Sequence, residues 1–484
     1  MNLTQLKSSL VWRYFEILTT IPRPSGKEER VAKWLIEFAK ERSLKWRQDE
    51  TGNVMISVPA TSGREQSPVV TMQAHMDMVC EKRGTSNHNF ESDPLEVYIE
   101  DGWVRARDTT LGADCGIGVA AALAALSDPE LEHGALEALF TVDEERGLTG
   151  AFGLGEGMIG GDMLINLDSE EEGEIFIGCA GGVDTTAVFS YKSESVASDC
   201  EIFRLSVGGL LGGHSGDDIN KGRANAVKTL ARLLFEGALI YGVRLVSMDC
   251  GNLKNAIPRE GWADLAIEPS SVEGFKALFE GYCKTIANEC QMYDPAAKLT
   301  LEKVEREGAV EVIDMITQFS LVGALVSLPN GVMAMSESMQ GLVESSSNLA
   351  AVKFVGENKI KVITSQRSSQ TEGREKIKNQ IHNALASAGA EVYHSNGYPG
   401  WNPNPKSKLL AVAQSSYREL FGEEAKVRAI HAGLECGLFL ERNPNLDMIS
   451  FGPTMTGVHS PDERLEISSV ERFWAHLSHI LSHI

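Results

Sequence analysis

The side chains best able to do chemistry are acids and histidines placed where apolar, β-favouring segments end. The run 69–74 is followed by His75, and the run 163–167 is followed by Asp168. Carboxylates and imidazoles are common ligands of Zn²⁺, and two such ions can promote attack by water. The sequence therefore predicts a two-metal hydrolytic site. The candidate residues are His75, Asp77, Asp114, Glu144, Glu145, Asp168 and His459.

The segments around these residues predict an α/β fold. Short apolar runs that end at turn signals are typical of strands buried in a parallel sheet. Polar residues at the carboxyl ends of such strands converge on one crevice. We expect a mostly parallel central sheet flanked by helices. The expected helices are 11–19, 27–41, 116–126 and 409–420, and the expected strands are 53–58, 69–74, 136–140, 163–167, 426–430 and 448–451.

The pattern changes near residue 185 to longer amphipathic β segments separated by single helices, which favours a separate α+β domain with two βαβ-like halves. A turn-rich segment, Tyr398 to Pro405, then precedes the part of the chain that holds His459. We therefore predict a catalytic domain built from residues 1–184 and 401–484. Residues 185–400 would form a domain inserted into it.

Composition excludes several classes of protein. The net charge of −22 opposes nucleic-acid binding, which needs clustered Lys and Arg. No run of 18 apolar residues or secretory signal pattern is present, so we expect a cytoplasmic protein with no membrane partner. The eight cysteines form no C-x-x-C pair, which favours reduced, structural thiols.

Each candidate taken singly has a simpler interpretation. His75 and Asp77 could be a strand-end His with an Asp cap, and Asp114 could be the N-cap of the Ala-rich helix. Asp143-Glu144-Glu145 could be a solvated acidic turn. However, these interpretations would all have to hold at strand ends of one sheet. Three carboxylates and two histidines suit two Zn²⁺ ions better than Ca²⁺ or Mg²⁺, which prefer oxygen alone.

Several motifs, in order along the chain, resemble the co-catalytic zinc exopeptidases related to carboxypeptidase G and aminoacylase, and most of all their branch of aminoacyl-histidine (Xaa-His) dipeptidases. The motifs are Gln73-Ala74-His75-Met76-Asp77-Met78-Val79, Thr110-Leu111-Gly112-Ala113-Asp114, Glu144-Glu145, Asn166 to Glu174, Gly213-His214-Ser215-Gly216, Asn255 to Arg259, His431 to Gly437 and Gly457 to Glu463.

The resemblance implies a role for each residue. His75, Asp114 and Asp168 would hold one zinc, and Asp114, Glu145 and His459 the other, with Co²⁺ or Mn²⁺ as other possible ions. Asp77 would orient His75, and Glu144 would be the general base. The inserted domain would be a lid, in which His214 polarises the scissile carbonyl while Asn255 and Arg367 contact the substrate. A homodimer is a further expectation.

Two residues depart from the family pattern. Asp143 extends the glutamate pair to three acids, so the base and the ligand could each shift by one position, and Arg146 could pair with one of the acids. The expected activity is hydrolysis of Xaa-His dipeptides. A broader dipeptidase or an N-acyl amino acid amidohydrolase would use the same chemistry, and a metal-free binding protein is the alternative of a different class.

Overall fold

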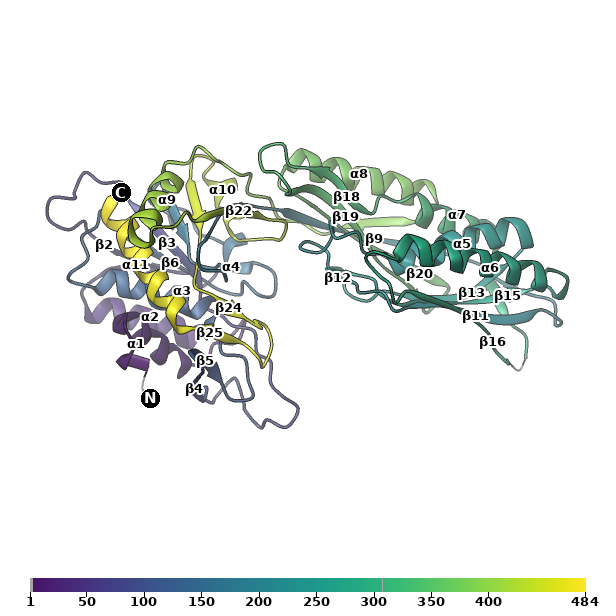
Figure 1. Cartoon of the computed structure of the whole chain (residues 1–484), viewed down its shortest axis with the longest axis horizontal. Coiled ribbons are helices and arrows are strands. Elements are labelled where there is room, and N and C mark those ends of the chain that lie inside the picture. Colours follow the sequence, from purple (N-terminus) through teal and green to yellow (C-terminus); the bar gives the residue numbers. More distant parts are fainter. Residues whose placement is uncertain (1–2, 307) are drawn as a thin grey trace. The chain divides into compact units, whose positions relative to one another are not determined.

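The computed structural model describes residues 3–306 and 308–484. The chain divides into two compact units, shown in Figure 1. Unit 1 consists of Met1–Gly178, Pro403–Ala429 and Glu435–Ile484, and unit 2 consists of Cys179–Asn402 and Ile430–Leu434. Both are built around a sheet, and each is described by itself below.

The main sheet of unit 1 is mixed, with a parallel centre. Within the described residues its strand order is β1-β2-β6-β3-β7-β23-β8-β22. The neighbours β6, β3, β7 and β23 are parallel, whereas β1, β2 and β8 pair antiparallel. This confirms the predicted α/β class. The strands are β1 (Lys45–Gln48), β2 (Val54–Val58), β3 (Val70–His75), β6 (Leu136–Thr141), β7 (Met163–Asn166), β8 (Glu174–Cys179), β22 (Lys426–Ile430) and β23 (Asp447–Ser450).

Helices cover this sheet, and α3 (Ala113–Ser127) is the most deeply placed. Residues 115–126 are all buried, as expected for a helix that is apolar on every side. The helix contacts both α1 and β3. A small sheet, β24 (Met455–Thr456), β25 (Arg464–Glu466), β5 (Trp103–Ala106) and β4 (Val97–Glu100), lies in the same unit. The other helices are η1 (Leu3–Gln5), α1 (Ser9–Thr19), α2 (Glu29–Glu41), α4 (Thr149–Phe152), α9 (Lys408–Phe421), α10 (Cys436–Arg442) and α11 (Ile467–His483).

Unit 2 is built on an antiparallel sheet of order β16-β11-β15-β13-β19-β20-β9-β21, with β18 added on β19. Strands β11 and β13 both pair antiparallel with β15, so they are parallel to each other and α5 connects them. Strands β20 and β21 stand in the same relation across β9, connected by α8. In each of the two βαβ-like halves that the sequence predicts, an antiparallel strand therefore lies between the two parallel strands.

The strands of unit 2 are β9 (Gly181–Ser190), β10 (Ser193–Ser195), β11 (Glu201–Gly208), β12 (Gly213–His214), β13 (Arg244–Cys250), β14 (Ala256–Ile257), β15 (Gly261–Ile267), β16 (Lys298–Lys303), β17 (Glu311–Ile313), β18 (Gly331–Met335), β19 (Val343–Val355), β20 (Lys359–Ser368) and β21 (Glu391–His394). Its helices are α5 (Ala226–Tyr241), α6 (Pro269–Cys290), α7 (Met315–Ser327) and α8 (Thr371–Ser387). Apolar side chains from the sheet and these helices form one buried cluster.

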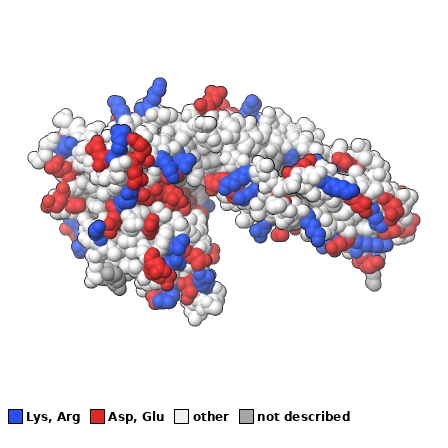
Figure 2. Space-filling view, viewed as in Figure 1, with Lys and Arg blue, Asp and Glu red and all other residues white. Residues whose placement is uncertain are grey.

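Two surface properties bear on the predicted partners. Figure 2 shows Lys and Arg scattered among Asp and Glu on the visible face, rather than gathered into one basic surface. In the part of the chain that the structure describes, no helix is long and apolar enough to cross a bilayer.

Candidate metal centre

The strand order of unit 1 brings the predicted residues to one edge of the sheet. His75 is the last residue of β3, which lies between β6 and β7 and runs parallel to both. Glu144 and Glu145 follow the end of β6, and Asp168 follows the end of β7. Because the carboxyl ends of neighbouring parallel strands meet at the same edge, these side chains from three strand ends lie together.

Asp114 lies between the two histidines of the centre. Its Oδ1 is 3.0 Å from His75 Nε2, and its Oδ2 is 3.1 Å from His459 Nε2. His75 Nε2 is also 3.4 Å from Asp168 Oδ1, and His459 Nε2 is 3.0 Å from Glu145 Oε1. Each histidine therefore shares Asp114 with one further carboxylate, so the five side chains form two three-residue groups joined at Asp114.

The backbone explains why Asp114 can take this place. Gly112 is the N-cap of α3, and Asp114 has φ −79° and ψ 115°, outside the helical region. The chain is therefore kinked at Asp114, and the two oxygens of its carboxylate contact His75 and His459. Gly118 allows α3 to approach the end of β7, because a Cβ at this position would lie 2.7 Å from the carbonyl oxygen of Leu167. The close packing brings Asp114 toward Asp168.

His459 enters the group from the loop after β24. Its φ of 60° lies in the left-handed region, which is uncommon for a residue with a side chain and is often found at functional sites. The side chain is half exposed, at 50%, whereas that of Glu145 is 7% exposed. The centre is thus open to solvent at His459 and closed at its other residues.

The electrostatics of the group favour a bound cation. Hydrogen bonds to Asp114 and Glu145 raise the pKa of His459 to about 11. Burial lowers the pKa of His75, but the charge of Asp168 and hydrogen bonds to Asp114 and Asp168 outweigh it and raise this pKa well above its usual value. Burial raises the pKa of Asp168 to about 6. Three crowded carboxylates need positive charge nearby, and nitrogen and oxygen donors at these distances fit divalent metal ions.

Asp77 lies behind His75 and is fully buried. Its Oδ1 is 3.3 Å from His75 Nδ1, on the side of the ring away from Asp114. The same carboxylate accepts hydrogen bonds from the backbone N–H groups of Glu144 at 3.1 Å and Glu145 at 3.4 Å. Burial acts to raise the pKa of Asp77, but its contacts with His75 lower it to about 2. One carboxylate thus touches both the imidazole and the loop that carries the two glutamates.

Glu144 is placed among other acids. Burial raises its pKa well above the usual value, and the charges of Asp168, Glu435 and Glu145 add to this effect while His75 opposes it. A carboxyl group with a raised pKa can accept a proton near neutral pH and release it again.

Asp143 and Arg146, the two departures from the family pattern, pair with each other. Arg146 Nε donates to Asp143 Oδ1 at 2.5 Å, and Thr149 Oγ1 donates to Asp143 Oδ2 at 2.6 Å. Asp143 has φ 51° and is buried, so its carboxylate is held by these partners. The three acids therefore do not form a solvated turn. Of the three, Glu145 is the acid that contacts His459.

Glu463 and Arg23 are two buried residues near the centre that sequence reasoning missed. The Glu463 carboxylate accepts hydrogen bonds from the backbone N–H groups of residues 111–114, at 2.7, 3.0, 2.8 and 3.4 Å. Arg23 donates to the carbonyl oxygens of Met76, Asp77 and Gly112. These two residues fix the loop before Asp114 and the end of β3. Glu463 belonged to a motif quoted above, but nothing in the sequence indicated its partner.

A buried polar network beneath the centre was also missed. Gln73 Nε2 donates to Glu435 Oε2 at 2.6 Å and to Thr141 Oγ1 at 3.1 Å, and Asn166 Nδ2 donates to Gln73 Oε1 at 2.6 Å. Burial raises the pKa of Glu435 to about 8. The polar residues within the apolar strand runs, Gln73 and Asn166, were the available signal.

Cys115, next to Asp114, behaves as the predicted structural thiol. It is buried, and its Sγ donates to the carbonyl oxygen of Leu167 at 3.3 Å. Burial raises its pKa well above the usual value, which disfavours the thiolate that a nucleophile needs.

The three predicted substrate contacts, His214, Asn255 and Arg367, lie in unit 2. His214 in β12 pairs with Ala256 in β14, and Asn255 accepts a hydrogen bond through its carbonyl oxygen from Ser215 N at 2.8 Å. Arg367 is 8% exposed and donates to Tyr398 OH at 3.3 Å. Burial lowers the pKa of His431, and the charge of Arg367 lowers it further. The hydrogen bond to His214 lowers the pKa of Asp217, and the charge of Arg367 again adds to the effect. The three residues therefore belong to one polar region of unit 2.

Comparison with known proteins identifies the family. Residues 71–483 match peptidase family M20/M25/M40. The chain belongs to this family. The match covers both units, and it agrees with the resemblance to zinc exopeptidases that the motifs indicated.

Similar proteins of known name extend over the full chain. The chain is 40% identical to the cytosol non-specific dipeptidase of Escherichia coli over 483 residues, which cover 100% of this chain and 99% of that protein. The crystal structure of aminoacylhistidine dipeptidase from Vibrio alginolyticus superposes with a TM-score of 0.93 at 40% identity, covering 100% of this chain and 98% of that one. Aminopeptidase PepT from Bacillus cereus, at 15% identity and a TM-score of 0.62 over 99% and 98%, shares the fold.

Proposed function

We propose that this protein is a two-metal dipeptidase that hydrolyses the peptide bond of short peptides, with Xaa-His dipeptides among its preferred substrates. The observation that carries the proposal is the position of Asp114, whose two carboxylate oxygens face two different histidines. A single carboxylate shared in this way is suited to joining two metal ions.

The ligands follow from the two groups around Asp114. His75, Asp114 and Asp168 would hold one ion, and Asp114, Glu145 and His459 the other. Zn²⁺ is the proposed metal, since it accepts both nitrogen and oxygen donors, and Co²⁺ or Mn²⁺ could replace it. Bound metal would polarise the peptide carbonyl and make water a stronger acid.

The remaining groups of the centre would position residues and move protons. Glu144 would take a proton from the attacking water on its carboxylate and deliver it to the amine nitrogen as the C–N bond breaks. The raised pKa of Glu144 supports both the uptake of the proton from water and its delivery to the amine nitrogen. Asp77 would hold the ring of His75 through Nδ1, while Glu463 and Arg23 would hold the loop of Asp114.

Unit 2 would act as a lid that contributes substrate contacts. The Arg367 guanidinium is suited to a carboxylate of the peptide, because it can form paired, charge-assisted hydrogen bonds. Asn255 would contact the peptide through its amide, and His214 would donate a hydrogen bond to the scissile carbonyl.

The names of the similar proteins suggest two ranges of substrate. The Escherichia coli relative is called non-specific, and the Vibrio protein is named for aminoacyl-histidine. We favour a dipeptidase that cleaves Xaa-His among other dipeptides, in the cytosol, as a homodimer. A dipeptidase that does not prefer His, or an N-acyl amino acid amidohydrolase, is the second candidate.

The test compares kcat/KM for matched Xaa-His and Xaa-Gly dipeptides and for N-acetyl amino acids, using purified protein reconstituted with Zn²⁺. We expect hydrolysis of both dipeptides, with Xaa-His favoured, and little hydrolysis of the N-acetyl amino acids. No cleavage of Xaa-His would contradict the proposed specificity. No cleavage of any of these substrates would favour a binding protein without catalytic activity.

A further inference from the structure

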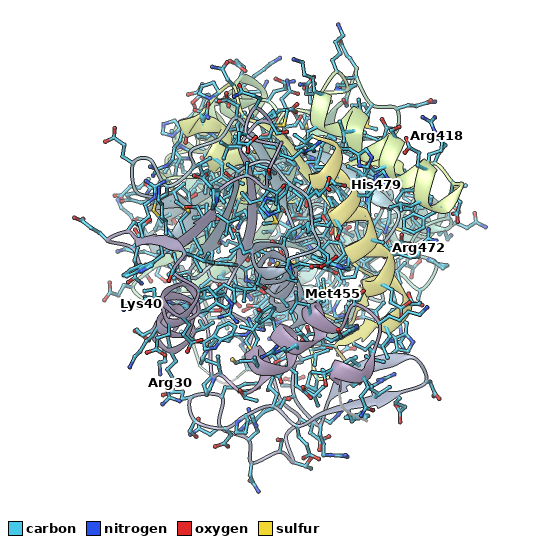
Figure 3. All side chains as sticks on the ribbon, turned by 90° about the vertical axis from the view of Figure 1, so that its left-hand side faces the viewer. Arg30, Lys40, Arg418, Met455, Arg472 and His479 are labelled. Atoms are coloured by element: carbon cyan, nitrogen blue, oxygen red, sulfur yellow. The ribbon has the colours of Figure 1, made fainter. Side chains whose placement is uncertain are left out.

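A second group of metal-ligand side chains lies on the surface of unit 1, away from the strand ends. His479 and His483 are four residues apart on α11, so they lie on the same face of the helix. Their rings are stacked, with centroids 3.9 Å apart and planes 10° apart. Helix α9 packs against α11 and supplies Glu419, and Figure 3 labels His479 on α11 and Arg418, the neighbour of Glu419, on α9.

The three side chains are close enough to share one ion. One ligand atom from each of Glu419, His479 and His483 lies within 4.8 Å of the others. His479 Nε2 and Glu419 Oε2 are 3.9 Å apart, too far for a hydrogen bond. Small side-chain rotations would bring these atoms to the spacing of ligands around a single ion, since Zn–N and Zn–O bonds are about 2.0–2.2 Å.

The hydrogen bonds of His483 leave one of its nitrogens available to a metal. His483 Nδ1 is 2.7 Å from the carbonyl oxygen of His479, which can only accept, so Nδ1 carries the proton. Ser482 Oγ donates to the same carbonyl oxygen. The lone pair of the neutral ring is therefore on Nε2. A ligating histidine usually donates its other ring N–H to a carbonyl oxygen or a carboxylate in this way.

Glu419 is oriented by a hydrogen bond from its own helix. Ser415 Oγ donates to Glu419 Oε1 at 2.9 Å, which leaves Oε2 directed at His479. His479 Nδ1 is buried without a hydrogen-bond partner, so Nε2 is the nitrogen that can reach an ion.

We propose that Glu419, His479 and His483 form a surface site for one divalent transition-metal ion of the class of Zn²⁺, Ni²⁺ and Cu²⁺. Imidazole nitrogen suits these ions, whereas Mg²⁺ and Ca²⁺ prefer oxygen alone. The site shares no residue with the metal centre of the proposed function. A bound ion would link α9 to α11 and stabilise the folded state, by an amount that grows with the logarithm of the ion concentration above its Kd.

The direct test is a count of bound metal. Wild type, His483→Gln, Glu419→Gln and the control Glu423→Gln are stripped with a chelator, reconstituted with Zn²⁺, desalted and analysed by mass spectrometry. We expect His483→Gln to hold one ion fewer per chain than wild type, and Glu419→Gln to hold its ion more weakly. The control, which removes an exposed carboxylate four residues further along, should match wild type. The difference of one ion is measurable whatever number of ions the catalytic centre holds.

A second readout uses thermal unfolding with Ni²⁺ as the probe. Wild type should gain about 2 °C or more in Tm relative to the gain of His483→Gln under the same conditions. Peptidase activity should be the same in both proteins, since His483 is outside the catalytic centre. Equal metal content and an equal Tm gain in wild type and His483→Gln would overturn the proposal.

Discussion

The candidate metal centre of unit 1 and the polar region of unit 2 are held in different ways. In unit 1, Glu463 accepts four backbone N–H groups beside Asp114, and Asp77 contacts both His75 and the glutamate loop. In unit 2, the Arg367 side chain donates to Tyr398 OH at 3.3 Å, and its Nε is buried without a hydrogen-bond partner among the residues that the structure describes.

This difference suggests a division of work between the two units. Unit 1 fixes the positions of charged groups before any ligand arrives, as a metal centre requires. Unit 2 keeps hydrogen-bond donors that a substrate carboxylate could use. We therefore expect substitutions in unit 1 to change metal binding or kcat, and substitutions in the unit 2 region to change KM more.

The largest effect is expected at the proposed base. Glu144→Gln removes the group that would accept a proton, so kcat should fall by about 10²–10⁴-fold while metal content is unchanged. Steady-state kinetics and metal analysis measure the two quantities. Glu171→Gln, which changes an exposed acid after β7, should retain activity. A Glu144→Gln enzyme with near wild-type kcat would remove Glu144 from the base role.

The second prediction uses a contrast between histidines. Those of the metal centre have raised pKa values, whereas burial lowers the pKa of His431 in unit 2 to about 4, with Arg367 and His214 adding to the effect and Asp217 opposing it. The unfolded chain therefore binds a proton first as the pH falls. Above pH 6.5 the free energy of unfolding is not reduced by His431. Between pH 6.5 and 4, protonation of His431 in the unfolded chain lowers the free energy of unfolding by up to about 3 kcal/mol.

His431→Gln should show less of this pH dependence, since Gln does not titrate but can still bond to Ser346 Oγ, which lies 2.7 Å from His431 Nε2. Urea unfolding of both proteins at pH 7 and pH 5 makes the comparison. Equal losses of stability in the two proteins would show that His431 does not carry the effect.

The third prediction concerns the rigidity of unit 1. Glu463→Gln replaces the carboxylate that accepts the N–H groups of residues 111–114 with an amide that has one acceptor oxygen, so affinity for metal should fall by about 10–100-fold. Competition with a coloured chelator measures the affinity. Asp462→Asn is the matched control, because Asp462 is 68% exposed and pairs with Arg83 at the surface. If both variants bound metal as wild type does, Glu463 would have no positioning role.

The smallest effect is expected for a conservative change in unit 2. Arg367→Lys keeps the charge but loses the planar fork, so KM should rise about tenfold with kcat changed much less and metal content unchanged. Dipeptides compared with the corresponding dipeptide amides would locate the lost contact. An equal rise in KM for both substrates would mean that Arg367 does not bind the carboxylate.

The fold class could be predicted from the sequence because its strands are short apolar runs with clear ends. The expected strand 426–430 is observed as β22, and the helix 116–126 lies within α3. Boundaries were less accurate where backbone conformation decides them. The helix expected to begin at residue 27 begins at Glu29, since Glu28 takes φ −87° and ψ 3°, outside the helical region.

The individual roles within the site were harder to predict. Residue type and position along the chain were sufficient to propose the set of candidate residues, whereas the division into five ligands and a base came from the family resemblance. Partners distant in sequence, such as Glu463 with residues 111–114 or Gln73 with Glu435, depend on tertiary packing that no local pattern encodes. The pairing of Asp143 with Arg146 likewise became clear only from side-chain directions.

In the proposed function, Asp114 joins two metal ions in unit 1. Anomalous X-ray diffraction at the zinc edge, from crystals reconstituted with Zn²⁺, tests it most directly. We predict two peaks beside Asp114, one in contact with His75 and Asp168 and the other with Glu145 and His459. A single peak, or no peak at Asp114, would contradict the two-metal centre.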